Sequence, residues 1–314
     1  MDNENYGSSE ISSLYSPGKS YWNNRKSVLE HRQKFAAMSQ AVASPVNLSL
    51  HQWNQLFTFA LEFKPDLIVE LGRGPGNSTC VFTEVANALK PGQCKVLSLC
   101  LTDEWQKKTV PELRKVVEES WFEPLEAIQG DIVKFNFKDV LSHYNRIFLF
   151  YDAHGYDVAE HILGTFLPAI TDRPHLVVVH DLSDARYVSL PQGDYRLWKG
   201  ENDFGARIRL GHIDSQVEEV ISIIDFTQRN HLILHSADYS MHEELGTNQV
   251  RELDQTLGTD LFSQSCHWFW FSLNEIPKPY SFPIPGDIST KSGKSKNSFR
   301  AFMGGAMRRI MGSP

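Results

Sequence analysis

Residues 66–79 read DLIVELGRGPGNST, and this stretch decides the fold. An apolar strand pattern ends near Glu70, and a turn with glycines at positions 72, 74 and 76 follows it directly. A helix pattern begins after the turn. This order places unpaired backbone N–H groups at the carboxyl edge of a sheet, where a ligand can approach the backbone closely. The stretch therefore predicts a ligand site, with a tight turn that binds nothing as the alternative.

The spacing of the glycines indicates which ligand the turn suits. Dinucleotide-binding turns follow GxGxxG and need a third glycine at position 77, where this chain has Asn77. The turn reads GxGxG instead, and no GK[ST] of a Walker-type phosphate loop follows it. Glu70 would repel a pyrophosphate but suits the ammonium group of an amino-acid moiety. The pattern favours such a ligand over NAD, which is the more distant alternative.

Short apolar strands alternate with helix patterns after residue 65, which is typical of a parallel sheet with crossover helices. The expected strands are 66–71, 95–101, 125–129, 146–151, 176–181, 231–237 and 266–273. The expected helices are 25–42, 47–62, 77–89, 105–118, 156–169 and 214–228. These patterns predict an α/β fold with a doubly wound, mostly parallel, seven-stranded sheet.

The chain divides by composition into three parts. Residues 1–48 are expected to form an arm, without periodicity over about its first 20 residues, and a helix. Residues 49–275 are expected to form the α/β domain, with a candidate substrate loop at 183–212. Residues 276–314 form a tail rich in Pro, Gly, Ser and Lys.

Charge is distributed unevenly along the chain. Residues 281–314 carry six basic residues and one acidic residue, a net charge of +5, which leaves −12 on the remainder of a chain whose total is −7. An acidic body disfavours a nucleic-acid partner. The basic tail, with its apolar residues, is a candidate contact for an anionic membrane surface or a partner protein, and a disordered tail is the alternative.

The overall composition is that of a soluble globular protein, with 41% hydrophobic and 22% charged residues among 314. No apolar run approaches the roughly 20 residues of a membrane-spanning helix, and the N-terminus lacks a secretory signal pattern. The four cysteines form no CxxC pair, which predicts reduced thiols and a cytoplasmic location. A homo-oligomer is left open.

The segment from Glu70 to Gly76 resembles the first motif of the class I S-adenosylmethionine-dependent methyltransferases, an acidic residue followed by xGxGxG. The resemblance covers about residues 50–275 and continues at later strand ends, in LCLTDEW at 99–105, Gly130-Asp131, YDAHGYD at 151–157 and VVVHDLSD at 177–184. The last two segments resemble most the metal-assisted small-molecule O-methyltransferases. The related cephalosporin-hydroxylase-like and macrocin or rhamnosyl O-methyltransferase-like proteins belong to the same group.

This resemblance implies S-adenosylmethionine (SAM) as the cofactor and a set of residues that hold it. Asp103 is expected at the ribose hydroxyls, with Glu104 as the alternative, and Gly130-Asp131 at the adenine. The full implied set is Glu70, Gly72, Gly74, Gly76, Asn77, Asp103, Gly130, Asp131 and Asp152.

Asp152 and the His180-Asp181 pair end neighbouring expected strands, so they can converge in one crevice. Two carboxylates and an imidazole can hold a divalent cation such as Mg²⁺, which would lower the pKa of a bound hydroxyl. The histidine suits Mn, Fe or Zn better than Mg²⁺. The alternative is structural, with Asp152 capping the next helix and Asp181 anchoring the loop.

His154 is the preferred general base, because its ordinary pKa of about 6.5 lets it accept a hydroxyl proton at neutral pH. The resembling proteins often carry the basic residue three positions after the acid, where this chain has Gly155. His180 is therefore the rival, and Asp152, His154 and His180 are the catalytic candidates.

Together these features predict an enzyme that transfers a methyl group from SAM to oxygen of a small-molecule or glycan acceptor. One alternative keeps the fold and changes the chemistry, as in the hydroxylase-like members of the resembling group. The other is a binding module without catalysis.

Overall fold

The computed structural model describes residues 14–43, 48–180 and 222–281. The chain divides into two units, residues 1–280 and 281–314. The fold below concerns the first unit. The candidate substrate loop, Asp181 and the tail from residue 282 lie outside the described residues, so the predictions made for them stay predictions.

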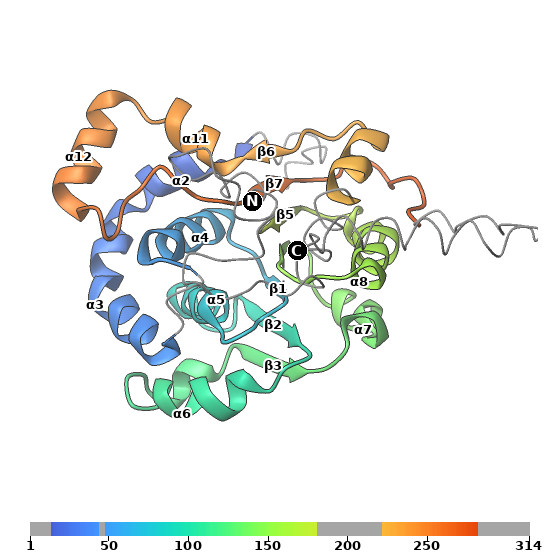
Figure 1. Cartoon of the computed structure of the whole chain (residues 1–314), viewed down its shortest axis with the longest axis horizontal. Helices are drawn as coiled ribbons and strands as arrows, with labels where there is room; N and C mark the ends of the chain where they lie inside the picture. Colours follow the sequence, from blue (N-terminus) through green and yellow to red (C-terminus); the bar gives the residue numbers. More distant parts are fainter. Residues whose placement is uncertain (1–13, 44–47, 181–221, 282–314) are drawn as a thin grey trace, which may run out of the picture. The chain divides into compact units, whose positions relative to one another are not determined.

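A seven-stranded sheet runs through the first unit in the order β3-β2-β1-β4-β5-β7-β6 (Figure 1). Its strands are β1 Leu67–Leu71, β2 Lys95–Cys100, β3 Leu125–Gln129, β4 Ile147–Tyr151, β5 His175–Val179, β6 His235–Ser236 and β7 Phe269–Phe271. The first five strands pair in parallel, whereas β7 is antiparallel to both β5 and β6. The predicted doubly wound, mostly parallel sheet is confirmed. Its strand order reverses between β1 and β4, which is the switch point where ligands bind in such sheets.

Helices cover both faces of the sheet, which explains why every residue of β1, β4 and β5 is buried. Figure 1 shows α3 (Arg25–Val42), α4 (Leu50–Phe63) and α5 (Asn77–Ala88) on the left of the sheet. The right side carries α7 (Phe137–Leu141) and α8 (Tyr156–His161).

Aromatic rings join α4 to the sheet. The ring of Phe59 lies 5.9 Å from that of Phe148 on β4 and 5.3 Å from that of Trp268, next to β7. All three side chains are fully buried. Edge-to-face and tilted pairs of this kind add specific geometry to the apolar burial, so they fix the position of α4 over the strands.

The first unit also contains the helices α2 (Pro17–Asn23), α6 (Val110–Leu113), α11 (Ala237–Glu243) and α12 (Thr247–Leu257). Two short segments are π-helical, η2 (Trp105–Thr109) and η5 (Ile162–Phe166), and three are 3₁₀ helices, η3 (Glu119–Phe122), η4 (Ile132–Lys134) and η6 (Leu167–Ile170).

Several expected bounds differ from the observed ones. Part of the segment expected as an arm is the helix α2, because Tyr21 is buried and its hydroxyl donates to the carbonyl of Leu261, 2.5 Å away. The helix expected over 105–118 ends at Leu113, and the strand expected over 231–237 is only His235–Ser236. Of the helix expected over 214–228, residues 222–228 are helical as predicted, and residues 214–221 lie outside the described part.

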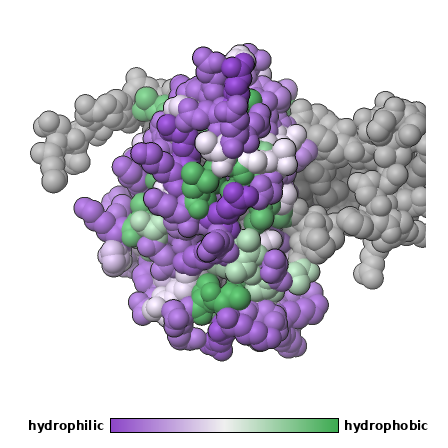
Figure 2. Space-filling view, turned by 90° about the vertical axis from the view of Figure 1, so that its left-hand side faces the viewer, coloured by the Kyte–Doolittle hydropathy of each residue, from purple (hydrophilic) through white to green (hydrophobic). Residues whose placement is uncertain are grey.

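The face in Figure 2 is mostly hydrophilic, with hydrophobic residues in small separate groups. No helix in the described ranges has the length and apolar composition needed to cross a membrane. All four cysteines are described; each is buried and has a free thiol.

Candidate functional site

The glycine turn after β1 has positive φ angles at Gly72, Gly74 and Gly76, of +100°, +51° and +104°. A Cβ added at Gly72 would lie 1.9 Å from the carbonyl oxygen of Asp152, and one at Gly76 would lie 2.2 Å from the ring of Trp105. At Gly74, no heavy atom of the described residues lies within 4 Å of such a Cβ. Two of the glycines are therefore required by close packing, and the middle one borders open space.

Glu70 ends up beneath this turn, fully buried. Its Oε1 accepts a hydrogen bond from the hydroxyl of Ser78 (2.5 Å), and its Oε2 accepts from Thr79 (2.6 Å) and from Ser98. Burial raises the pKa of Glu70, and the three hydroxyls together with the charge of Arg73 oppose that rise. These contacts tie β1 to α5 and β2. The expected contact with a ligand ammonium group stays a prediction.

Arg73 is the residue of the site that sequence reasoning missed. Its side chain is buried beneath the turn, where Nη1 donates to the carbonyl of Ser98 (2.7 Å) and Nη2 to that of Ile128 (3.1 Å). Burial lowers the pKa of Arg73, opposed by the charge of Glu70. No local signal reveals such a role, because the residue between two glycines of a turn ordinarily faces solvent.

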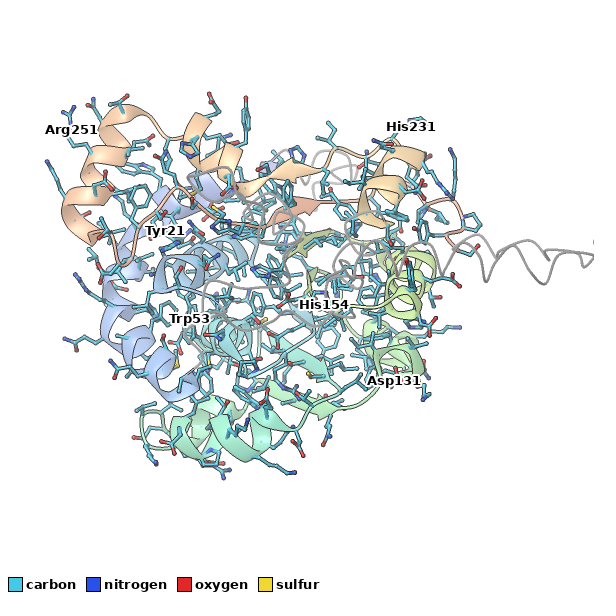
Figure 3. All side chains as sticks on the ribbon, viewed as in Figure 1. Tyr21, Trp53, Asp131, His154, His231 and Arg251 are labelled. Atoms are coloured by element: carbon cyan, nitrogen blue, oxygen red, sulfur yellow. The ribbon has the colours of Figure 1, made fainter. Side chains whose placement is uncertain are left out.

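Asn77 begins α5 at the position where a dinucleotide-binding turn would need glycine. Its Oδ1 accepts a hydrogen bond from Nε1 of Trp53 on α4, 3.2 Å away, and Figure 3 labels Trp53 on that helix. The Nδ2 of Asn77 is buried and has no hydrogen-bond partner within the described residues. The side chain therefore joins two helices and keeps one unused donor beside the turn.

Asp152 and His180 meet at the carboxyl ends of β4 and β5, as the parallel pairing predicts. The His180 Nδ1 lies 3.3 Å from the Asp152 Oδ1, and both side chains are partly exposed, at 15% and 25%. The backbone N–H of Asp152 donates to the carbonyl of Leu71 (2.9 Å), so the pair lies against the end of β1. Asp181, the third expected metal ligand, lies outside the described residues.

The neighbouring segment carries His154, the preferred base, followed by Gly155 with a φ of +119°. Figure 3 labels His154 near the middle of the sheet and Asp131 beside α7. Within residues 14–43, 48–180 and 222–281, no group of three or more His, Cys, Asp or Glu is arranged to hold a metal ion.

The two carboxylates expected at the nucleoside end lie just beyond β2 and β3 and are partly exposed. Asp103 pairs with Lys107, and the alternative Glu104 pairs with Lys108 at 2.6 Å. Asp131, which follows Gly130, accepts a hydrogen bond from the backbone N–H of Val133 (3.0 Å) and so caps η4. Asp131 also pairs with Lys134 at 3.0 Å, so both carboxylates are partly exposed and each has a lysine as a neighbour. Their expected contacts with a nucleoside stay predictions.

The strand β2 itself ends at Cys100, whose Sγ lies 3.4 Å from the hydroxyl of Thr102. The thiol is buried. The strand β2 therefore ends without an acidic residue. The first acidic residue after it is Asp103, two residues beyond Leu101.

No family model matches this sequence, and no curated protein matches it. Several solved structures match this chain, at low sequence identity. An SAH-bound methyltransferase of Podospora anserina, PaMTH1, is 13% identical, with 76% of this chain and 87% of that chain covered and a TM-score of 0.47. An O-methyltransferase from Bacillus cereus in complex with SAH is 12% identical, with 72% and 94% covered and a TM-score of 0.38. TomG of Streptomyces achromogenes, an O-methyltransferase solved with SAM, is 15% identical, with 63% and 80% covered and a TM-score of 0.37. At these identities and TM-scores, the assignment of a function depends on the residues of the site.

Proposed function

We propose that this chain is a SAM-dependent methyltransferase that acts on oxygen of a small-molecule or glycan acceptor. The observation that carries the proposal is the contact between two parts of the site. The glycine turn of β1, open at Gly74, packs at Gly72 directly against the backbone of Asp152, whose carboxylate meets His180. A cradle for a donor and a polar pair for an acceptor thus share the switch point of the sheet.

The residues of the turn fit the donor in three respects. Gly72 and Gly76 allow the close packing that shapes the turn, Gly74 leaves room beside the backbone, and Asn77 offers an unused buried N–H donor. Nucleoside contacts are assigned to Asp103 and Gly130-Asp131, at the ends of β2 and β3. SAM would supply a methyl group already activated on a sulfonium.

The chain's own contribution to the reaction is alignment and proton handling. Holding an acceptor hydroxyl in line with the donor removes much of the entropic barrier. His154 and His180 are the two candidates for accepting the hydroxyl proton, and the contact of His180 with Asp152 supports the second. The choice between them is testable by replacing each in turn with glutamine.

Asp152 and His180 would also hold a divalent cation, with Asp181 as a third ligand. Such a cation would lower the pKa of the acceptor hydroxyl. This is the finer form of the proposal, and it predicts that activity is lost in EDTA and regained with added metal.

Calorimetry with SAM and with NAD, each with and without EDTA, tests the proposal. We expect SAM to bind and NAD not to bind. Binding of NAD alone would refute the donor assignment. The mass gained by an acceptor, a methylene for methylation or an oxygen for hydroxylation, separates the methyltransferase from the hydroxylase-like alternative.

A cytoplasmic location, self-association and a tail that contacts an anionic membrane or a partner protein are further proposals from the sequence. Removal of residues 281–314 followed by liposome sedimentation tests the membrane contact, and unchanged sedimentation would contradict it.

A further inference from the structure

The guanidinium of Arg73 is a buried charge in the middle of the glycine turn, with 2% of the residue exposed. A buried guanidinium is costly unless its N–H groups are satisfied. An apolar residue would fill the same space without that cost. Filling space therefore does not explain an arginine at this position, whereas the hydrogen bonds of its guanidinium do.

Arg73 connects the turn to two strands at once. Its Nη1 donates to the carbonyl and to the hydroxyl of Ser98 on β2, at 2.7 and 3.0 Å. Its Nη2 donates to the carbonyl of Ile128 on β3, at 3.1 Å. Both carbonyls lie within two residues of the carboxyl ends of their strands. One side chain thus spans from the end of β1 to the end of β3.

The hydroxyl of Ser98 also joins Arg73 to Glu70. It accepts from the guanidinium and donates to the Glu70 carboxylate. In the register of the sheet, Glu70 lies opposite Ser98, so the three groups form one buried network across adjacent strands. The Nη1 and Nη2 groups of Arg73 are hydrogen-bonded, whereas its Nε is buried with no hydrogen-bond partner among the described residues. The linked groups still fix geometry, because moving Ser98 or Arg73 breaks hydrogen bonds to a buried charge.

We propose that Arg73 is a positioning residue, which sets the distance between the glycine turn and the carboxyl ends of β2 and β3. The inference rests on the proposed function, in which the amino-acid end of the donor lies at the turn and its nucleoside end lies at β2 and β3. A ligand that spans both halves gains affinity only when their separation matches its length. A fragment that occupies one half has no such requirement.

Two probes that differ by the amino-acid end test this. S-adenosylhomocysteine spans both halves, whereas 5′-methylthioadenosine contains only the nucleoside half. In Arg73→Met, which removes hydrogen bonds made by a charged group, we expect the affinity for S-adenosylhomocysteine to fall about tenfold or more. The affinity for 5′-methylthioadenosine should change far less. Arg73→Lys, which keeps a charged donor able to reach one carbonyl, should recover part of the loss.

Arg173 provides the matched control. Its Nη1 also joins two backbone carbonyls, those of Leu141 (2.6 Å) and Tyr144 (2.9 Å), while its Nε and Nη2 pair with the carboxylate of Asp172. It lies before β5, at the opposite, amino edge of the sheet. Arg173→Met should therefore lower the melting temperature and leave the affinities for both probes unchanged. All variants are compared as folded full-length chains, checked by circular dichroism.

The outcomes distinguish a failure of the positioning role of Arg73 from a failure of the proposed function. Equal losses for both probes in Arg73→Met, or no loss for either, would overturn the positioning role while leaving the proposed function intact. A wild-type chain that binds neither probe would overturn the proposed function and the positioning role with it. If Arg73→Met does not fold, the ratio of the two affinities in Arg73→Lys decides the question in the same way.

Discussion

Gly74 and Gly92 are two glycines with the same local geometry at opposite edges of the sheet. Their φ angles are +51° and +75°, and a Cβ at either would meet no heavy atom of the described residues within 4 Å. Gly74 is in the turn after β1, at the carboxyl edge, whereas Gly92 precedes β2, at the amino edge. Replacing Gly74 with asparagine changes the turn that is assigned to the methyl donor, whereas replacing Gly92 with asparagine leaves that turn unchanged.

The cost to stability should be small and equal in the two variants. Asparagine tolerates the left-handed region better than other residues, so each change should cost about 1 kcal/mol or less. The loss of backbone freedom in the unfolded chain offsets part of that cost. For a chain of this size, we expect a decrease in melting temperature of about 2–4 °C or less.

The effect on donor affinity should differ sharply. A side chain at position 74 enters the volume assigned to the donor, and overpacking of this kind typically costs about 1–3 kcal/mol. This corresponds to about a 5- to 150-fold rise in the dissociation constant of SAM. Gly92→Asn should bind SAM as the wild type does.

Titration calorimetry and thermal unfolding of the two variants measure both quantities. A folded Gly74→Asn that binds SAM with unchanged affinity would show that the open space at the turn is not where the donor lies. Equal losses of affinity in both variants would point instead to a general disturbance of the fold.

Three further results are expected. Gly72→Ala should be destabilised by about 2 kcal/mol or more in urea unfolding, because its Cβ would collide with the Asp152 backbone; wild-type stability would contradict that packing. Burial opposes the charged form of His31, but its hydrogen bonds and the charge of Glu84 together outweigh burial and raise the pKa of His31 above 6.5. The charged pair therefore stabilises the fold below pH 6.5, and this stabilisation is lost as the pH rises through the raised pKa. His31→Gln should therefore lower the free energy of unfolding more at pH 5.5 than at pH 9, and an equal loss would rule out the charged pair. Asp103→Asn should weaken SAM binding about tenfold, as expected for loss of a charged hydrogen-bond acceptor at the ribose, with an unchanged melting temperature; unchanged affinity would favour Glu104.

The five parallel strands and the glycine turn were predictable because they depend on local patterns, whereas the two last strands, β6 and β7, are shorter than expected. β1, β4 and β5 are short, mostly apolar runs, with Glu70 inside β1 and His175 as the first residue of β5. The observed bounds of α3, Arg25–Val42, are those expected from periodicity alone. The meeting of Asp152 and His180 followed from a rule of parallel sheets, since neighbouring strands end at the same edge.

The helix α2 was not predictable, because distant residues stabilise it. Its Gly18 packs against α11, where a Cβ would lie 2.6 Å from the carbonyl of Ser240, and the Gly18 N–H donates to the Ser240 hydroxyl at 3.0 Å. The helix α12 did carry a readable signal, with Val250, Leu253 and Leu257 spaced along one face. The partners of Glu70 and Arg73 had no such signal, because they come from β2, β3 and α5.

The burial of Glu70 changes how the site can attract a cationic donor. Its carboxylate is held by three hydroxyls and lies near the charge of Arg73, so the two opposite charges largely cancel beneath the turn. A cancelled pair exerts little long-range attraction on a ligand. Asp152 packs against the turn through its backbone, and its carboxylate beside His180 is partly exposed. In the proposed function that carboxylate is better placed than the one of Glu70 to attract positive charge. Under the proposed function, we therefore expect Glu70 to shape the turn and the carboxylate of Asp152 to attract the cationic donor.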